Sequence, residues 1–355
     1  MRFLLDAEQR AFTDSLHAML SAADTPAVIR DWSRGDHASG RALWSRIAEA
    51  GVFGLAVPEE YGGLGPRPVE LALAFVELGR HAVPGPLVET VVAAALVQDL
   101  PSARRFLPGL AAGTDLATVA APTGQHPPGT GATVRTPTGH ALDADAATLR
   151  LALTADGLHL STTAAGPPRR SLDPARRLTP LAPDGELLTP DPPRDRALTR
   201  ARLATAAQAL GVGLALLDRT VGYVRQRTQF GVPVGSFQAV KHRLADARTA
   251  LEFARPLVLG AALSLRPADV AAAKLTACEA AYGTARTALQ LHGAIGYTAE
   301  YDLSLWLTKA RALRTAWGTP EECRQAVLDD ALKGDEADSR SPRSRPNGGR
   351  TDSGA

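Results

Sequence analysis

Two short stretches of this chain carry residue types and spacings from which a nucleotide site could be built. The first, RTQFG (227–231), places Arg227 and Gln229 just before Phe230, where the chain turns at Gly231 ahead of a proline. A guanidinium can hold a diphosphate through two parallel hydrogen bonds, and Phe230 offers a flat apolar wall for a purine. This stretch therefore predicts contacts with the diphosphate and base of a nucleotide.

The second stretch, HGAIGY (292–297), places Gly293 and Gly296 three residues apart at the expected end of a helix. Glycine lets the backbone approach a ligand closely, and it also commonly ends a helix without any ligand. Both interpretations stay open from the residues alone. His292 and His242 lie beside these stretches, and we expect each to be a hydrogen-bonded structural histidine, since neither has a sequence neighbour to orient it.

The rest of the chain predicts three folded regions that would position these residues. Residues 1–113 show apolar residues at helical spacing and predict an N-terminal helical domain. Residues 114–195 are rich in Pro, Gly and Thr, with short alternating runs and a hairpin pattern around Asp156-Gly157, so they predict a small, shortened β domain. Residues 196–333 predict a C-terminal four-helix bundle. The polar tail, 334–355, is expected to be disordered.

Composition excludes several function classes. Lys and Arg number 39 against 37 Asp and Glu, a net charge of +2 that is too balanced to indicate a nucleic-acid partner. The two cysteines, Cys278 and Cys323, lack metal-ligand spacing, so we expect buried thiols and no metal site. The N-terminus does not resemble a signal peptide, and the apolar runs are far shorter than a membrane span. We therefore expect a cytoplasmic protein without a membrane partner.

Longer segments around the two glycine-containing stretches resemble one enzyme family. The segments are YVRQRTQFGVPVGSFQAVKHRLAD (223–246) and LHGAIGYTAEYDLSLWLTKARALRTAWGT (291–319), and they are similar to the acyl-CoA dehydrogenases. PEEYGGLG (58–65) and SLDPARRL (171–178) match where that family would place them. The resemblance implies a mainly helical fold: an N-terminal helical domain, a β-barrel-like middle domain and a C-terminal four-helix bundle that forms dimers or tetramers.

The resemblance also implies a cofactor and its contacts. The family holds FAD with its adenosine diphosphate end across a subunit interface. The residues that match flavin contacts from one subunit are Arg227, Gln229, Phe230 and Gln238. Those that match contacts with a neighbour's flavin are Gly293, Gly296 and Thr319. Arg202 lies on the helix where the family has an arginine that helps hold the acyl thioester, so the resemblance implies a substrate contact. The acyl group could be carried by CoA or by a carrier protein. The alternative interpretation is that Arg202 belongs to a solvated basic face.

The catalytic base is where the sequence departs from the family. Removal of a proton α to a thioester needs a carboxylate in a dry site, and the family supplies it at one of two positions. Here those positions are occupied by Trp317 and Ala201. An indole has only an N–H donor and cannot act as a base. The Thr-rich pattern that would contact the flavin ring in the β domain is also missing from 115–134.

Three hypotheses follow from this loss. We favour a subunit of a heteromeric acyl-CoA dehydrogenase whose homologous partner supplies the base. The alternatives are a homo-oligomeric flavoenzyme with a relocated base, and a repurposed non-redox protein without FAD. Glu321 and Glu322 are the nearest candidates for a relocated base, although they are better explained as favourable charges in the first turn of the last helix.

Overall fold

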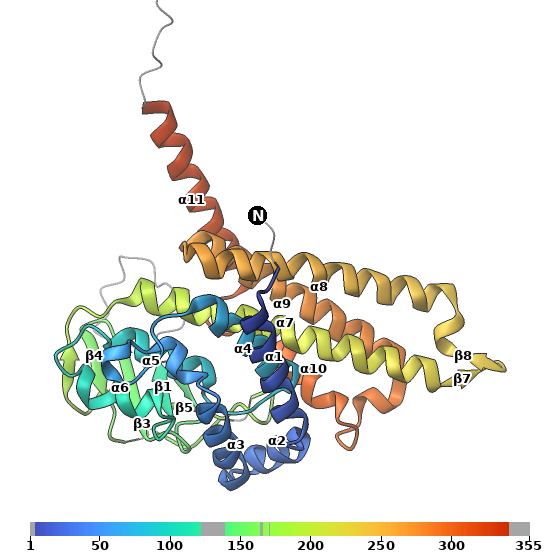
Figure 1. Ribbon diagram of the computed structural model, residues 1–355, viewed down its shortest axis with the longest axis horizontal. Helices are drawn as coiled ribbons and strands as arrows, with labels where there is room; N and C mark the ends of the chain where they lie inside the picture. The colour runs from blue at the N-terminus through green and yellow to red at the C-terminus, as the bar shows by residue number, and fades with distance from the viewer. Residues whose placement is uncertain (1–3, 122–138, 164–165, 170, 341–355) are drawn as a thin grey trace, which may run out of the picture.

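The computed structural model describes residues 4–121, 139–163, 166–169 and 171–340, and its N-terminal region is helical (Figure 1). An Asp6–Gln9 capping box begins the first helix, and short 3-10 turns follow the third. The elements are α1 (Ala7–Ser21), α2 (Thr25–Arg34), α3 (Ala38–Glu49), η1 (Phe53–Ala56), η2 (Glu59–Tyr61), α4 (Pro68–Arg80), α5 (Leu87–Val97) and α6 (Ala103–Ala111).

The middle region is a small β structure, as the sequence predicts. A four-stranded sheet has the order β1-β3-β4-β6, in which β1 is parallel to β3 and the other pairs are antiparallel. A second pair, β2 with β5, lies beside β1. The hairpin expected at Asp156-Gly157 is confirmed. The strands are β1 (Ala117–Ala120), β2 (His140–Leu142), β3 (Leu149–Thr154), β4 (Gly157–Leu160), β5 (Leu178–Pro180) and β6 (Leu187–Thr189).

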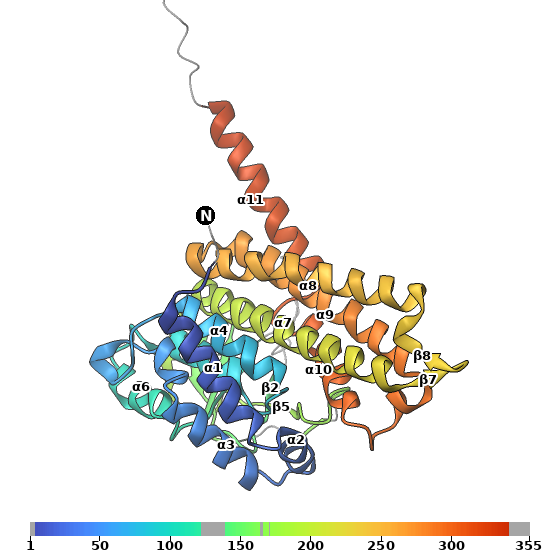
Figure 2. The same cartoon turned by 45° about the vertical axis from the view of Figure 1, so that its right-hand side comes forward.

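Three long helices form the C-terminal bundle. The first is α7 (Arg194–Gln226). A short hairpin of β7 (Thr228–Gln229) and β8 (Val232–Pro233), with the 3-10 turn η3 (Val234–Ser236), connects α7 to the second helix, α8 (Gln238–Ser264). The third helix, α9 (Pro267–His292), returns alongside α7 and is followed by η4 (Gly293–Tyr297). α10 (Leu303–Thr315) packs on α7 and α9, while α11 (Pro320–Arg340) rises away from the body (Figures 1 and 2).

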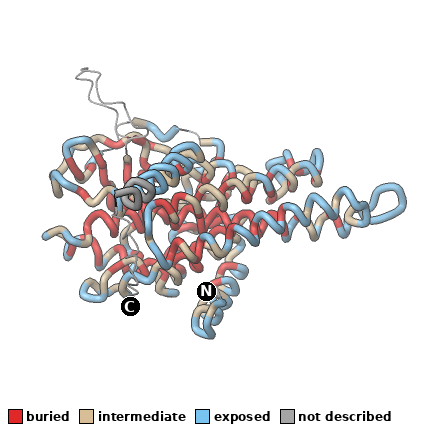
Figure 3. Tube along the Cα trace, turned by 90° about the horizontal axis from the view of Figure 1, so that it is seen from above, coloured by how far each residue is buried: buried red, intermediate tan, exposed pale blue. Residues whose placement is uncertain are grey.

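The N-terminal region and the bundle share one core because α4 and α7 pack backbone to backbone. A Cβ on Gly79 would lie 2.1 Å from the Gln208 carbonyl oxygen, and a Cβ on Gly211 would lie 1.9 Å from the Val76 carbonyl oxygen. Only glycine fits at such close approaches. The burial map shows this shared core as a continuous buried layer, with exposed residues toward the hairpin end of the bundle (Figure 3).

One helix was not singled out by the sequence patterns, and one expectation about the tail was wrong. α10 lies between 297 and 320, with Leu303, Trp306, Ala310 and Leu313 buried at helical spacing. The tail was expected to be disordered from residue 334, but α11 continues to Arg340, because a helix already begun gains a backbone hydrogen bond for each further residue that joins it. Residues 341–355 lie outside the described residues.

Across the described residues, no helix combines the length and hydrophobicity that a bilayer crossing would require.

Candidate active site

The sequence-predicted site residues gather at two opposite ends of the bundle. Tyr223 stacks on His292 with ring centroids 4.2 Å apart, so the C-terminal ends of α7 and α9 lie together. Arg202 lies near the other end of α7 and contacts Trp317. The 21 residues between Arg202 and Tyr223 correspond to about 30 Å of helix. The predicted site residues of one chain therefore lie in two separate groups.

The structure places the predicted flavin contacts within the chain. Gly293 and Gly296 were expected to contact, with Thr319, a neighbour's flavin, whereas Arg227 was expected to be a flavin contact from one subunit. The stacking of His292 on Tyr223 places both glycines at the hairpin end with Arg227, whereas Thr319 lies at the far end beside Trp317. Sequence spacing could not show this, because it contains no information on which helix ends meet. Which flavin each residue contacts stays a prediction.

Trp317 lies in a tight turn between α10 and α11. Two cationic side chains stabilise this turn by hydrogen bonds to its backbone carbonyl oxygens. Its own φ is +57° and that of Gly318 is +131°. Lys274, 1 % exposed, donates to the carbonyl oxygens of Arg314 at 3.2 Å and of Gly318 at 2.6 Å. Arg202 donates to the Trp317 carbonyl oxygen at 3.2 Å. Arg202 therefore holds the turn in this structure, which leaves its expected contact with an acyl thioester a prediction.

The side chain of Trp317 points at a buried acid. Its indole Nε1 donates to Oε1 of Glu89 on α5 at 3.2 Å, and the second oxygen of Glu89 is buried without a partner among the described residues. Burial raises the pKa of Glu89, and attraction to Arg176 together with the indole hydrogen bond opposes the rise only in part. The position expected to hold a base thus carries a donor that contacts a carboxyl group from another helix.

Further buried charges surround Glu89. Lys309 on α10 donates to the Val83 carbonyl oxygen at 3.1 Å and lies 3.9 Å from Oδ2 of Asp173. Burial lowers the pKa of Lys309, and the attraction of Asp173 opposes this. Asp143 is completely buried with φ +51°, and burial raises its pKa to about 7. These groups join the N-terminal region, the β region and the bundle at one place.

The other predicted residues at the Trp317 end contact the core or cap a helix. Ala201 is 0 % exposed and part of the core. Thr319 and Glu322 form a reciprocal cap on α11: the Thr319 N–H donates to Glu322 Oε2 at 2.7 Å, and the Glu322 N–H donates to the Thr319 hydroxyl at 3.2 Å. Glu321 also lies in the first turn of α11, as expected for a favourable charge at a helix start. Glu322 is therefore committed to a helix cap.

Two described cavities lie away from the predicted base positions. These cavities, of about 10 and 90 Å³, are lined by other residues, chiefly along α4, α5 and α8. Trp317, Ala201 and Glu89 line neither of them.

At the hairpin end of the bundle the predicted site residues are exposed. Phe230 has φ +51° at the tip of the β7–β8 hairpin and is 92 % exposed. Arg227, Gln229 and Gln238 are exposed as well, and the Arg227 guanidinium makes no ion pair or hydrogen bond with the described part of the chain. These side chains are free to contact a ligand, and the donor set of guanidinium, amides and aromatic face fits a nucleotide diphosphate.

The glycines of η4 complete this end. Gly293 ends α9 with φ +63°, and a Cβ added there would meet only open space, so backbone conformation selects this glycine. Gly296 is buried against His292, whose Nδ1 lies 2.8 Å from the Ala288 carbonyl oxygen. Burial lowers the pKa of His292. His292 is thus a hydrogen-bonded structural residue, as expected. The same expectation was wrong for His242, which is exposed on α8 and makes no side-chain hydrogen bond with the described residues.

Sequence reasoning missed the buried charges Glu89, Lys309 and Lys274. Glu89 stands alone in the apolar helical run LVETVVAAALV, and Lys274 lies within the run VAAAKLTAC. A single charge inside an apolar stripe is a signal of a buried polar contact. Its partners, however, come from distant parts of the chain and could not be read from the sequence.

Family models match both helical parts of the chain. The N-terminal domain of acyl-CoA dehydrogenases matches residues 6–114, and the C-terminal domain matches residues 195–332. Acyl-CoA dehydrogenase IpdE2 of Mycobacterium tuberculosis is 33 % identical over 319 residues, which cover 89 % of this chain and 94 % of the relative. The chain belongs to the acyl-CoA dehydrogenase family. The fold and family expected from the sequence are confirmed.

Solved acyl-CoA dehydrogenases superpose over nearly the whole chain. The Tcur3481–Tcur3483 steroid ACAD, in a variant form, is 26 % identical with a TM-score of 0.77 and covers 93 % of this chain and 99 % of its own. The ChsE4–ChsE5 complex of Mycobacterium tuberculosis has a TM-score of 0.80 at 24 % identity, covering 94 % of this chain and 99 % of its own. The second likeness shows the fold alone.

FAD is typical of this family, and the two ends of this chain differ in how they fit it. The hairpin end presents an unpaired guanidinium and an exposed aromatic ring, which fit the nucleotide part. The Trp317 end has its indole on Glu89 and lacks an acid at either family base position. The family's ring contacts would fall in the β-domain stretch 115–134, of which residues 122–134 lie outside the described residues.

Proposed function

We propose that this chain is one subunit of a heteromeric acyl-CoA dehydrogenase that desaturates an acyl thioester between its α and β carbons. The observation that supports this most is the split between the two ends of the bundle. The hairpin end keeps free nucleotide-binding side chains, whereas the turn at Trp317 is closed by an indole and a buried carboxyl group. Such a chain can serve a flavin whose reactive ring is held by another subunit.

In this proposal each end of the bundle has its own task. Arg227 and Gln229 bind the diphosphate of the FAD held by the homologous partner, and Phe230 covers its adenine. FAD, when bound, supplies the acceptor for the β-hydrogen as hydride. The partner's carboxylate removes the α-proton. Trp317 excludes a substrate from the corresponding position in this chain, so the pair holds one flavin for every two chains.

Exposed apolar side chains support an assembly through the bundle. On α8, Phe253 is 69 % and Leu263 is 58 % exposed; on the projecting α11, Leu328 and Leu332 are 55 % and 62 % exposed. Isolated large apolar residues are common at protein surfaces, but a projecting helix with two of them one turn apart favours a partner that covers it. A homologous subunit, with the same bundle, has the shape to do so.

A second candidate is supported by Glu89. Its carboxyl group is buried, has one unpartnered oxygen and lies against Trp317, so a rotation of the indole would present an acid to the site. This would make the chain a flavoenzyme with a relocated base. The pKa of Glu89 is raised, as in many catalytic acids and bases.

Substitutions in the assembled enzyme distinguish these candidates. The chain is co-expressed with a homologue that carries Glu at one of the two family base positions, and acyl-CoA-dependent dye reduction is measured. Replacing the partner's Glu by Gln should abolish turnover, while Glu89→Gln in this chain should leave kcat within about threefold. The opposite pattern would establish Glu89 as the base and refute the heteromeric assignment.

A further inference from the structure

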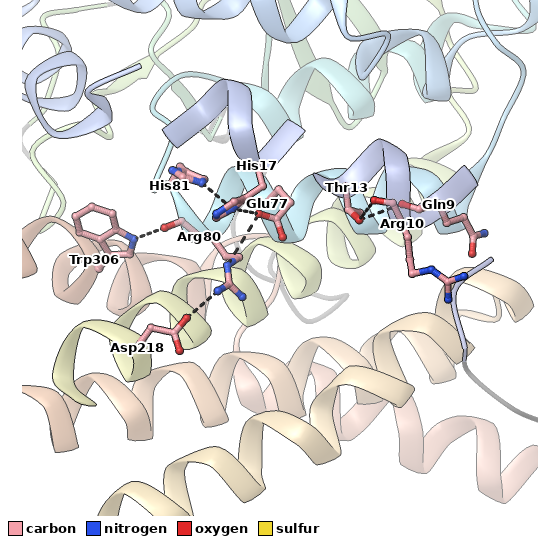
Figure 4. A network of polar contacts seen from close by, with 9 residues as sticks. All are labelled: Gln9, Arg10, Thr13, His17, Glu77, Arg80, His81, Asp218 and Trp306. Atoms are coloured by element: carbon pink, nitrogen blue, oxygen red, sulfur yellow. Dashed lines mark hydrogen bonds and ion pairs between the residues drawn. The ribbon is translucent and has the colours of Figure 1, made fainter. Parts of the chain in front are cut away.

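Three side chains that can ligate a metal ion converge where α1 crosses the C-terminal end of α4 (Figure 4). Nδ1 of His17 lies 2.9 Å from Oε2 of Glu77 and 3.2 Å from Nε2 of His81, and all three atoms lie within 4.8 Å of one another. Glu77 and His81 are one helical turn apart on α4, and His17 comes from α1. The sequence predicted no metal site because His17 is 60 residues away from the other two.

Hydrogen bonds satisfy this arrangement only if one proton is shared. Nδ1 of His17 cannot donate to Glu77 and accept from His81 at once. If it carries the proton, that proton has to be divided between the carboxylate of Glu77 and the lone pair on Nε2 of His81 in a three-centre bond. A cation between the three atoms would instead meet a lone pair from each of them.

The spacing fits a first-row divalent ion. Zinc binds imidazole nitrogen at about 2.0–2.1 Å in tetrahedral geometry, which places two ligand atoms about 3.3 Å apart. The two imidazole nitrogens here are 3.2 Å apart. Two His and one Glu form a ligand set that zinc uses when it keeps an open position for water. His17 is half exposed, so an ion could reach the site from solvent.

Two arginines, Arg80 and Arg219, lie near His81 and are the charges that compete with a cation. The Arg219 guanidinium lies over the ring of Trp306, 3.7 Å from its centroid. The Arg80 guanidinium lies 4.0 Å from Oε2 of Glu77, but it is engaged by Asp218 at 2.7 Å. Figure 4 shows Arg80 directed toward Asp218, on the side away from His81.

We propose that His17, Glu77 and His81 form a zinc site that fastens α1 onto α4. The Arg80 carbonyl oxygen accepts from the indole of Trp306 at 2.8 Å, so this end of α4 is itself fixed to α10 of the bundle. An ion here therefore joins the first helix of the chain to its C-terminal bundle. This site lies apart from both ends of the candidate active site and does not depend on the proposed function.

Zinc titration of the EDTA-treated full chain tests the proposal. We expect one Zn²⁺ per chain by calorimetry, a Tm that rises with zinc concentration, and intense visible bands when Co²⁺ replaces it. His17→Asn and His81→Gln keep an amide near the position of each ligating nitrogen, so they should fold. Each should weaken zinc binding at least ~100-fold, since even outer-shell losses cost about 10–100-fold.

His242→Gln is the matched control, because His242 is an exposed histidine on α8. It should leave the zinc affinity and the Co²⁺ spectrum unchanged. Absence of zinc binding to the wild-type chain would overturn the proposal. Equal zinc affinity in the wild type and in the His17→Asn and His81→Gln variants would overturn it as well, since the ion would then lie elsewhere.

Discussion

The indole of Trp317 donates a hydrogen bond to the buried carboxyl group of Glu89, across 3.2 Å and 228 residues of sequence. This contact links the turn before α11 to α5 of the N-terminal region. Trp317 is one of the two positions at which the resemblance predicts the family's catalytic base. The indole at this position makes a specific contact with a carboxyl group from another helix.

Trp317→Phe tests the strength of this contact. The variant keeps an aromatic ring at the same positive φ but removes the donor, leaving Glu89 without its indole partner. We expect a loss of about 1–3 kcal/mol in the free energy of unfolding, measured by urea denaturation. Trp317→Phe combined with Glu89→Met removes both polar partners and should be less destabilised than the sum of the single variants. Additive losses would show that the two residues do not interact.

Asp143 should make the unfolding free energy depend on pH. Its pKa rises from 3.8 to about 7 on folding, so folded protein holds a proton that unfolded protein releases between pH 4 and 7. The folded state is therefore penalised progressively as pH rises through that window. His81, whose pKa is lowered to about 4, acts in the opposite direction between pH 4 and 6.5, so a variant comparison is needed.

Asp143→Asn isolates the effect, because Asn accepts the same Arg177 N–H hydrogen bond and tolerates positive φ. Relative to wild type, it should gain on the order of 3–4 kcal/mol between pH 4 and pH 8, at about 1.4 kcal/mol per pKa unit. Parallel pH profiles of the two proteins, from urea unfolding, would contradict the prediction.

Lys309→Met should be strongly destabilising. It removes the cation that faces Asp173 while the carboxylate stays buried, and breaking such a pair costs about 3–5 kcal/mol. Adding Asp173→Asn should recover part of the loss, because the amide is neutral and can still accept from the Ala175 N–H. The exposed pair Arg105–Glu186 is the control: Arg105→Met should cost at most about 1 kcal/mol. Similar losses for Lys309→Met and Arg105→Met would refute this account.

The family and the order of domains could be predicted from the sequence because they depend on local patterns. Helical spacing, the Asp156-Gly157 turn and the motif around Phe230 are all contiguous. What could not be predicted are contacts between distant segments, such as Trp317 with Glu89 or the meeting of Tyr223 and His292. Those contacts decide which site residues act together, and they exist only once the helices are packed.

Arg227→Met and Phe230→Ser should weaken FAD binding without changing the stability of the fold. Both side chains are exposed on the hairpin, so each variant should change the unfolding free energy by no more than about 0.5 kcal/mol. In the assembled enzyme each substitution should cause flavin to be released. Arg227→Met should weaken FAD binding most, because it removes the positive charge that faces the diphosphate. Flavin retained at wild-type levels in both variants, after gel filtration, would remove the hairpin from the site.

The central claim is that this chain contributes to a flavin site without being able to turn over substrate by itself. Its most direct test is flavin bleaching by acyl-CoA thioesters under anaerobic conditions, with the flavin-to-protein ratio determined on the same samples. The chain co-purified with its homologous partner should hold one FAD per two chains and bleach on mixing. The chain purified alone should show no bleaching. Bleaching by the chain alone would contradict the account.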